Sequence, residues 1–137
     1  MDDSIAVATA TIGLDTYKTE LRARTHLVIG DEPPDVGGKD LGPRPGDFIR
    51  MGLASCTAIT LRMYANRKNM NVQKIFVTVS NGPTTGKTVL HTDIQIEGNI
   101  TDEQRTRMLQ IARLCPVHKM LSAPIEIETN LSTLSMD

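Results

Sequence analysis

The sequence predicts an α+β domain, and three observations carry this expectation. Segments of β-branched or alternating residues flank one long apolar segment with the features of a helix. A capping box at Thr101–Gln104 opens a second helix, and Gly- and Pro-rich segments separate several of the elements. A chain of 137 residues suits one compact domain, so we expect a single domain over residues 1–137.

The first part of the chain predicts strands followed by a loop. Residues 4–13 (SIAVATATIG) are small and β-rich and end at a glycine. Residues 16–24 (TYKTELRAR) alternate in the manner of a half-buried strand with a basic solvent face, and residues 25–29 extend it or start another. Residues 30–46 contain four prolines and five glycines, which predicts an ordered loop or a mobile flap.

A long helix is expected to begin at Pro45 and to end near Lys68. Proline in the first position, Asp47 in the first turn and basic residues in the last turn all match the preferences of helix ends. Apolar residues lie on nearly every face of this helix: Phe48, Ile49, Met51, Leu53, Ala54, Ile59, Leu61 and Met63. Such a helix is expected to be buried all round, so something besides the sheet of its own chain must cover it.

The second half of the chain predicts a hairpin, two short helical segments and a last strand. Residues 72–80 and 88–98 are strand-like and are joined by the turn-rich segment NGPTTGK. The helix opened by Thr101 carries Met108, Ile111, Ala112 and Leu114 on one side, and Pro116 ends it and begins the segment PVHKML. The closing segment alternates Ile125 and Ile127 with glutamates, which predicts a last strand.

Composition excludes several function classes. The aromatic content is 3% with no tryptophan, so the core is aliphatic, and this favours sharing the core with a second subunit. The net charge of −1 argues against nucleic acid, and no apolar run reaches the ~18 residues of a membrane span. Acidic residues stand at the start where a signal peptide is basic, so we expect a cytoplasmic protein in which any disulfide is transient.

The two cysteines of the chain are the candidate reactive residues. Cys115 precedes Pro116 and is expected at a helix N-cap, where backbone N–H groups favour a thiolate, and His118 lies within reach of the same sulfur. Cys56 lies in the middle of the long helix near Gly52 and Thr60, where burial raises the pKa of a thiol. From the residues alone, each cysteine is either part of a redox pair or an inert core residue.

Metal and cofactor sites are not expected. Cys115 and His118 form half of a possible zinc site, but His26 and His91 lie in separate predicted strands, so four scattered ligands would be needed. The chain also has no Gly-rich phosphate loop before a helix and no G-x-S-x-G motif.

The chain resembles the OsmC/Ohr family, and within it the OsmC-like branch. The resemblance runs over essentially the whole chain. It rests on His26 with the segment DEP and on Gly37-Gly38 and Gly42-Pro43 in the loop. Pro45 leading to LASCTAITLRMYANRK, the capping box followed by CPVHKML, and the closing strand also match. It implies an intertwined homodimer in which two long central helices are wrapped by antiparallel β-sheets from both chains. The partner subunit is then the missing cover of the long helix.

The resemblance also implies site residues and a reaction. It implies that Cys56 attacks a hydroperoxide, that Cys115 resolves the resulting sulfenic acid to a disulfide, and that a dithiol reductant resets the pair. The typical peroxidases of the family carry a Glu after the proline that opens the helix and an Arg after the first strand. Here those positions hold Gly46 and Leu14, so Asp47 takes the acidic role and Arg24, with Arg22 and Arg44 as alternatives, the cationic role.

The expected function is therefore the thiol-dependent reduction of organic hydroperoxides, since an aliphatic, Met-rich surround suits apolar substrates. A non-catalytic binding or stress-associated protein on the same fold, with silent cysteines, is the alternative. A structural cysteine pair is the third hypothesis, and it does not suit a reducing compartment.

Overall fold

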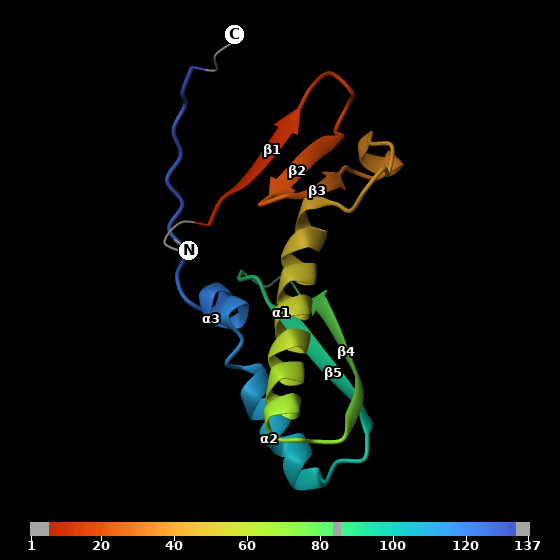
Figure 1. Ribbon diagram of the computed structural model, residues 1–137. Coiled ribbons are helices and arrows are strands. Elements are labelled where there is room, and N and C mark those ends of the chain that lie inside the picture. The colour runs from red at the N-terminus through yellow and green to blue at the C-terminus, as the bar shows by residue number, and fades with distance from the viewer. Residues whose placement is uncertain (1–5, 84–85, 134–137) are drawn as a thin grey trace. The chain divides into compact units, whose positions relative to one another are not determined.

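The chain has an α+β architecture in the computed structural model, which describes residues 6–83 and 86–133 (Figure 1). Its residues form two compact units, each described by itself. The first unit comprises residues 6–52, 79–83 and 86–91, and the second comprises residues 53–78 and 92–133. Helix α1, Pro45–Arg67, begins in the first unit and ends in the second. None of the helices within the described residues is long and apolar enough to cross a membrane.

An antiparallel sheet in the order β1-β2-β3 forms the first unit. Its strands are β1, Ala8–Ile12, β2, Thr19–Ala23, and β3, His26–Gly30. A turn at residues 24–25 follows Ala23, so residues 26–29 belong to a separate strand rather than extending β2. Residues 16–18, expected to be part of β2, form a turn because Thr16 adopts a left-handed φ of 49°. Residues 4 and 5 of the first expected strand lie outside the described residues.

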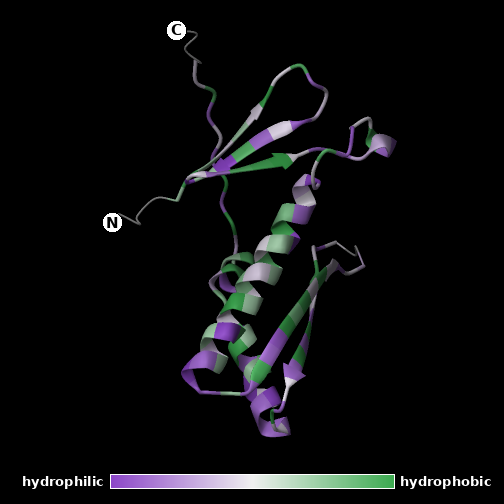
Figure 2. Cartoon of the chain, turned by 45° about the vertical axis from the view of Figure 1, so that its right-hand side comes forward, coloured by the Kyte–Doolittle hydropathy of each residue, from purple (hydrophilic) through white to green (hydrophobic). Residues whose placement is uncertain are grey.

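Apolar residues of this sheet are exposed in the described part of the chain. Much of β3 is hydrophobic in Figure 2, yet Leu27 and Val28 are 49% and 44% exposed. Exposed apolar residues on a sheet mark a surface that a partner can cover.

The loop after β3 is ordered. It contains a short 3₁₀ helix, Pro34–Val36, and folds back so that the Asp31 N–H donates to the Pro43 carbonyl at 3.1 Å. The buried Asp31 carboxylate accepts hydrogen bonds from the N–H groups of Glu32 at 2.7 Å and Leu41 at 3.1 Å. At Gly38 a Cβ atom would collide with the Glu32 carbonyl, so the fold of the loop requires glycine there.

The second unit contains the main hydrophobic core. Its elements are β4, Val72–Asn81, β5, Leu90–Gly98, and helix α2, Asp102–Ala112. The β4–β5 hairpin and α2 pack with the C-terminal half of α1, and α2 runs beside α1 in Figure 1. The buried core residues are Leu61, Ala65, Val72, Met108, Ile111 and Ala112. The predicted capping box is confirmed, because the Thr101 side chain accepts from the Gln104 N–H and the Gln104 side chain accepts from the Thr101 N–H.

Helix α1 is buried on one side only within this chain. A row spaced by four residues is buried: Leu53, Thr57, Leu61 and Ala65. The apolar residues Ile49, Met51, Ile59 and Met63 are 45% to 67% exposed. The single chain therefore does not bury α1 on all sides in the way that the sequence predicts. That a second copy of the chain covers the exposed side of α1 stays a prediction.

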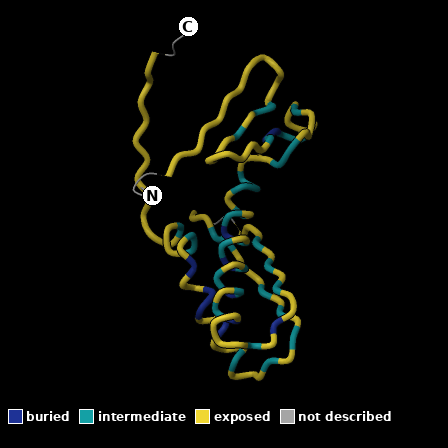
Figure 3. The backbone as a smooth tube through the Cα atoms, in the orientation of Figure 1, coloured by how far each residue is buried: buried dark blue, intermediate teal, exposed yellow. Residues whose placement is uncertain are grey.

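The predicted last strand is wrong. After helix α3, Pro116–Ser122, residues 124–133 have no strand structure and run exposed along the tube of Figure 3. The alternation at Ile125 and Ile127 is present, but these side chains are 57% and 82% exposed. A strand forms only when a neighbour accepts its backbone hydrogen bonds, and β4 and β5 pair only with each other among the described residues. Residue 134, at the end of the expected strand, lies outside the described residues.

Candidate active site: a pair of free thiols

Two elements of the second unit bring Cys56 and Cys115 together. Cys56 is half-buried on α1, and Cys115 is fully buried at the N-cap of α3. Both thiols are free, and they lie near enough for each to shift the pKa of the other. The two cysteines are 59 residues apart in the sequence (115 − 56), so the fold of the second unit brings them near each other.

Cys115 occupies the N-cap position that the sequence predicts. Pro116 stands in the first position of α3, and the Cys115 sulfur accepts a hydrogen bond from the His118 N–H at 3.5 Å. Burial acts to raise the pKa of Cys115, but hydrogen bonds from the Cys56 thiol, the N–H groups of His118 and Val117, and the Thr57 hydroxyl outweigh it. The pKa of Cys115 is therefore below its usual value.

Cys56 has the opposite tendency. Burial raises the pKa of the Cys56 thiol, and so do its hydrogen bond and its charge interaction with Cys115. The Val117 N–H and the Thr60 hydroxyl act against this without overcoming it. The two shifts therefore run in opposite directions: the surroundings of Cys115 favour its thiolate, and those of Cys56 favour its thiol.

This arrangement supplies both parts of a thiol oxidation cycle. A half-buried thiol lies near a buried thiol of lowered pKa, and two such thiols can take up an oxidant and then join as a disulfide. The two sulfurs form a strongly interacting pair, so their two ionisation steps belong to the pair rather than to either residue.

His118 contributes through its backbone rather than its ring. The expected contact with the Cys115 sulfur is made by the His118 N–H, whereas the ring Nδ1 lies 3.4 Å from the Ser122 hydroxyl. In the part of the chain that the structure describes, no three His, Cys, Asp or Glu side chains gather in a way that could hold a metal ion.

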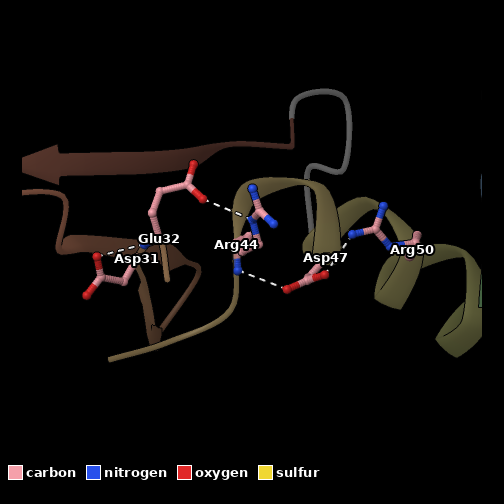
Figure 4. A network of polar contacts seen from close by, with 5 residues as sticks. All are labelled: Asp31, Glu32, Arg44, Asp47 and Arg50. Carbon is pink, nitrogen blue, oxygen red and sulfur yellow. Dashed lines mark hydrogen bonds and ion pairs between the residues drawn. The ribbon is translucent and has the colours of Figure 1, made fainter. Parts of the chain in front are cut away.

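Asp47 lies in a polar network of the first unit (Figure 4). Its carboxylate pairs with the Arg50 guanidinium at 2.7 Å and accepts from the Arg44 N–H at 3.0 Å. The hydrogen bond from Arg50, followed by that from Arg44, holds the pKa of Asp47 below its usual value. Arg44 in turn pairs with Glu32 at 3.0 Å. Asp47 therefore caps the first turn of α1 and fixes an arginine beside it.

Arg24 is placed in the turn between β2 and β3, with a φ of 55° and an exposed side chain. It belongs to the first unit, whereas both thiols belong to the second. Its cationic role stays a proposal, as does the acidic role of Asp47.

Two residues of interest were missed at the level of sequence. Arg50 was not considered as the cation, although its spacing of three from Asp47 on a helix is a recognisable signal. Thr57 was not considered as a partner of Cys115, although it is the one polar residue in the buried row of α1. A hydroxyl inside an apolar row signals a hydrogen-bond partner elsewhere in the fold.

The fold has many solved relatives. An OsmC like protein from Mycoplasma pneumoniae has a TM-score of 0.72 at 21% identity, over 88% of this chain and 89% of that one. An organic hydroperoxide resistance protein from Elizabethkingia anophelis has a TM-score of 0.65 at 21% identity, over 89% and 91% of the two chains. An organic hydroperoxide resistance protein OsmC from Legionella pneumophila has a TM-score of 0.62 at 20% identity, over 88% and 91%.

At these identities the solved structures show the fold alone. Among curated proteins, none matches the chain. The family model described as "OsmC-like protein" matches residues 37–130, well over half of the chain, and includes both cysteines. The protein therefore belongs to the OsmC-like family.

Proposed function

We propose that the protein reduces organic hydroperoxides with the thiol pair, Cys56 attacking and Cys115 resolving. The observation that carries the proposal is a half-buried free thiol, Cys56, near a buried free thiol, Cys115, whose pKa is held below its usual value. Solved relatives described as organic hydroperoxide resistance proteins support a role in peroxide stress.

The first step makes the accessible sulfur the nucleophile. The proton of the Cys56 thiol passes to the Cys115 thiolate, and the Cys56 thiolate attacks the terminal oxygen of the hydroperoxide. The O–O bond breaks, Cys56 becomes a sulfenic acid, and the alkoxide that leaves takes the proton from Cys115 to form an alcohol. Cys115 is then a thiolate again.

The second step closes the disulfide. The Cys115 thiolate attacks the Cys56 sulfur and displaces hydroxide, so that two thiols have supplied the two electrons that the hydroperoxide received. A dithiol reductant then reduces the disulfide and restores both thiols. Because no cofactor enters either step, the pair and the reductant suffice.

We propose Asp47 and Arg24 as further members of the site, with Arg50 as the alternative cation. The Asp47–Arg50 ion pair supports Arg50 as the cation, since it holds a carboxylate and a guanidinium side by side. Comparing Arg24→Ala with Arg50→Ala decides between them. The variant that lowers kcat/KM for a hydroperoxide identifies the cation, and wild-type kinetics in both would exclude Arg24 and Arg50 and leave Arg22 and Arg44 to be tested.

We also propose that the protein works as a homodimer that forms a single functional domain over residues 1–137. The exposed apolar residues on α1 and the unpaired segment after α3 support this, because a second copy can cover both. Sedimentation equilibrium tests it, and a monomer at all concentrations would contradict it.

The raised pKa of Cys56 favours a second candidate function, a small-molecule-binding or stress-associated protein with silent cysteines. The deciding experiment adds one equivalent of an organic hydroperoxide to the reduced protein and follows the products by mass spectrometry. Loss of two hydrogens with a Cys56–Cys115 link supports catalysis. Unmodified cysteines would establish the silent alternative.

A further inference from the structure

The end of β4 contains the one Asn-Gly pair of the sequence, Asn81-Gly82. The backbone nitrogen that follows an asparagine can attack the carbon of the side-chain amide, and glycine hinders this attack least because it has no Cβ atom. The attack expels ammonia and closes a cyclic imide, which water then opens to aspartate or isoaspartate. Asparagine is for this reason a chemically labile residue. How fast Asn81 reacts depends on how the fold holds these two residues.

Packing of the hairpin favours glycine at position 82. A Cβ atom at Gly82 would lie 2.6 Å from the Nε2 atom of His91 and 3.1 Å from the Cγ1 atom of Val89. Both distances are shorter than an ordinary van der Waals contact, so a larger residue fits only if His91 moves. The close approach of the two strands therefore accounts for the labile pair at this point of the chain.

Two hydrogen bonds of the first unit hold the atoms that would react. The Arg50 Nη1 atom donates to the Asn81 Oδ1 atom at 2.8 Å, which fixes the amide that would be attacked. The Gly82 N–H donates to the Val89 carbonyl at 2.8 Å, which engages the nitrogen that would attack. Closure of the imide ring draws the amide carbon and the nitrogen together and so disturbs both bonds.

Arg50 is itself held in place on its other side. Its Nη2 atom pairs with the Asp47 Oδ1 atom at 2.7 Å, and its side chain is 30% exposed (Figure 4). The guanidinium therefore has two fixed acceptors, the carboxylate of α1 and the amide of β4. A donor restrained in this way restrains its acceptor more than a freely moving side chain would.

We propose that Asn81 is a deamidation site and that Arg50 protects it by fixing its side-chain amide. The inference is independent of the function proposed above. The product replaces a neutral amide beside Arg50 with a carboxylate and adds one negative charge to the polar network of Asp47. Isoaspartate in addition lengthens the backbone at the end of β4, where the ladder with the next strand is still paired.

The test follows the peptide that contains Asn81 by mass spectrometry. The full-length protein is incubated at mildly alkaline pH in water enriched in heavy oxygen and is then digested in ordinary water, so that only deamidation during the incubation is counted. Arg50→Ala removes the donor to Asn81, and the net contribution of one hydrogen bond corresponds to a rate about twofold to tenfold above that of the wild type. If Arg50→Ala does not fold, Arg50→Met lacks the same donors at nearly the same length.

Arg44→Ala is the matched control. It removes a second guanidinium from the same polar network, the one that pairs with Glu32 at 3.0 Å, and leaves the bond between Arg50 and Asn81 in place. Its rate of deamidation at Asn81 is expected to equal that of the wild type. The wild-type chain unfolded in urea is expected to deamidate at Asn81 faster than the folded protein, since both hydrogen bonds are then lost.

A rate in Arg50→Ala equal to that of the wild type would overturn the protective role of Arg50. An equal acceleration in Arg44→Ala would overturn it as well, because the effect would then reflect general loosening of the network. Asn81 that stays unmodified even in the unfolded chain would refute the modification site itself. No step of the experiment uses a hydroperoxide, so these outcomes leave the proposed peroxidase function untouched, and failure of that function leaves them untouched.

Discussion

The two cysteines are expected to ionise in a fixed order, and single-cysteine variants test it. Cys56→Ala leaves Cys115 with hydrogen bonds from Thr57, Val117 and His118. Cys115→Ala leaves Cys56 with hydrogen bonds from Thr60 and Val117 only. The structure therefore gives Cys115 one more donor, the His118 N–H at 3.5 Å, once the mutual contact is removed.

The magnitude follows from that extra hydrogen bond. A hydrogen bond to a charged group contributes about 1.5–3 kcal/mol, and 1.36 kcal/mol corresponds to one pKa unit. The deeper burial of Cys115 offsets part of this. The pKa of Cys115 in Cys56→Ala is therefore expected about one unit below the pKa of Cys56 in Cys115→Ala.

Thiolate absorbance as a function of pH measures both values, and circular dichroism checks that each variant is folded. In the wild type, the first midpoint is expected to fall below both single-variant values and the second above both, because the two sulfurs interact. Equal midpoints in the two variants, or a lower midpoint for Cys56, would refute the assignment of the charge to Cys115.

Three substitutions test the fold that positions the site. Leu61→Ala removes a fully buried side chain from the core and is expected to lower the free energy of unfolding by about 2–5 kcal/mol in urea denaturation; a loss below about 1 kcal/mol would contradict the described core. Gly38→Ala is expected to destabilise the loop because a Cβ meets the Glu32 carbonyl, whereas Gly13→Ala, with open space around it, is the control; equal melting temperatures in the two variants would argue against the loop's fold. Burial acts to raise the pKa of Asp31, but hydrogen bonds from backbone N–H groups outweigh it and hold that pKa below its usual value of 3.8. The ionised carboxylate therefore stabilises the fold fully above pH 3.8, and this stabilisation is lost as the pH falls through the lower folded-state pKa. Asp31→Asn is therefore expected to be less stable than the wild type near neutral pH, with the difference shrinking in acid; a difference independent of pH would refute the role of the carboxylate.

Local signals were sufficient for most of the fold. The proline and the acidic first turn marked the start of α1, and the capping box at Thr101 marked that of α2. Cys115 was recognised as an N-cap from the proline that follows it. These features depend on neighbours within a few residues, so a single sequence contains the information.

The errors share a different origin. The alternation at Ile125 and Ile127 suits a strand, but pairing depends on a distant neighbour that this chain does not supply among the described residues. The full burial expected of α1 likewise depends on surfaces beyond one chain. A pattern of hydrophobic residues indicates that a surface is to be covered. It does not indicate which element or which chain covers it.

The site was predictable in its residues but not in its electrostatics. The sequence identified Cys56 and Cys115, and the fold of the second unit brings them near enough to shift each other's pKa. The Asp47–Arg50 ion pair depended on which side chains face one another. Burial and hydrogen bonding, which set the pKa of each thiol, follow only from the folded structure.

The most direct test of the account is a single turnover with one equivalent of an organic hydroperoxide. The reduced protein is mixed with the hydroperoxide, quenched with a thiol-blocking reagent and mapped by mass spectrometry. The account predicts one alcohol per disulfide, a Cys56–Cys115 link in the wild type, and a sulfenic acid on Cys56 in Cys115→Ala. A wild-type protein whose two cysteines are both blocked as free thiols after the hydroperoxide is added would contradict it.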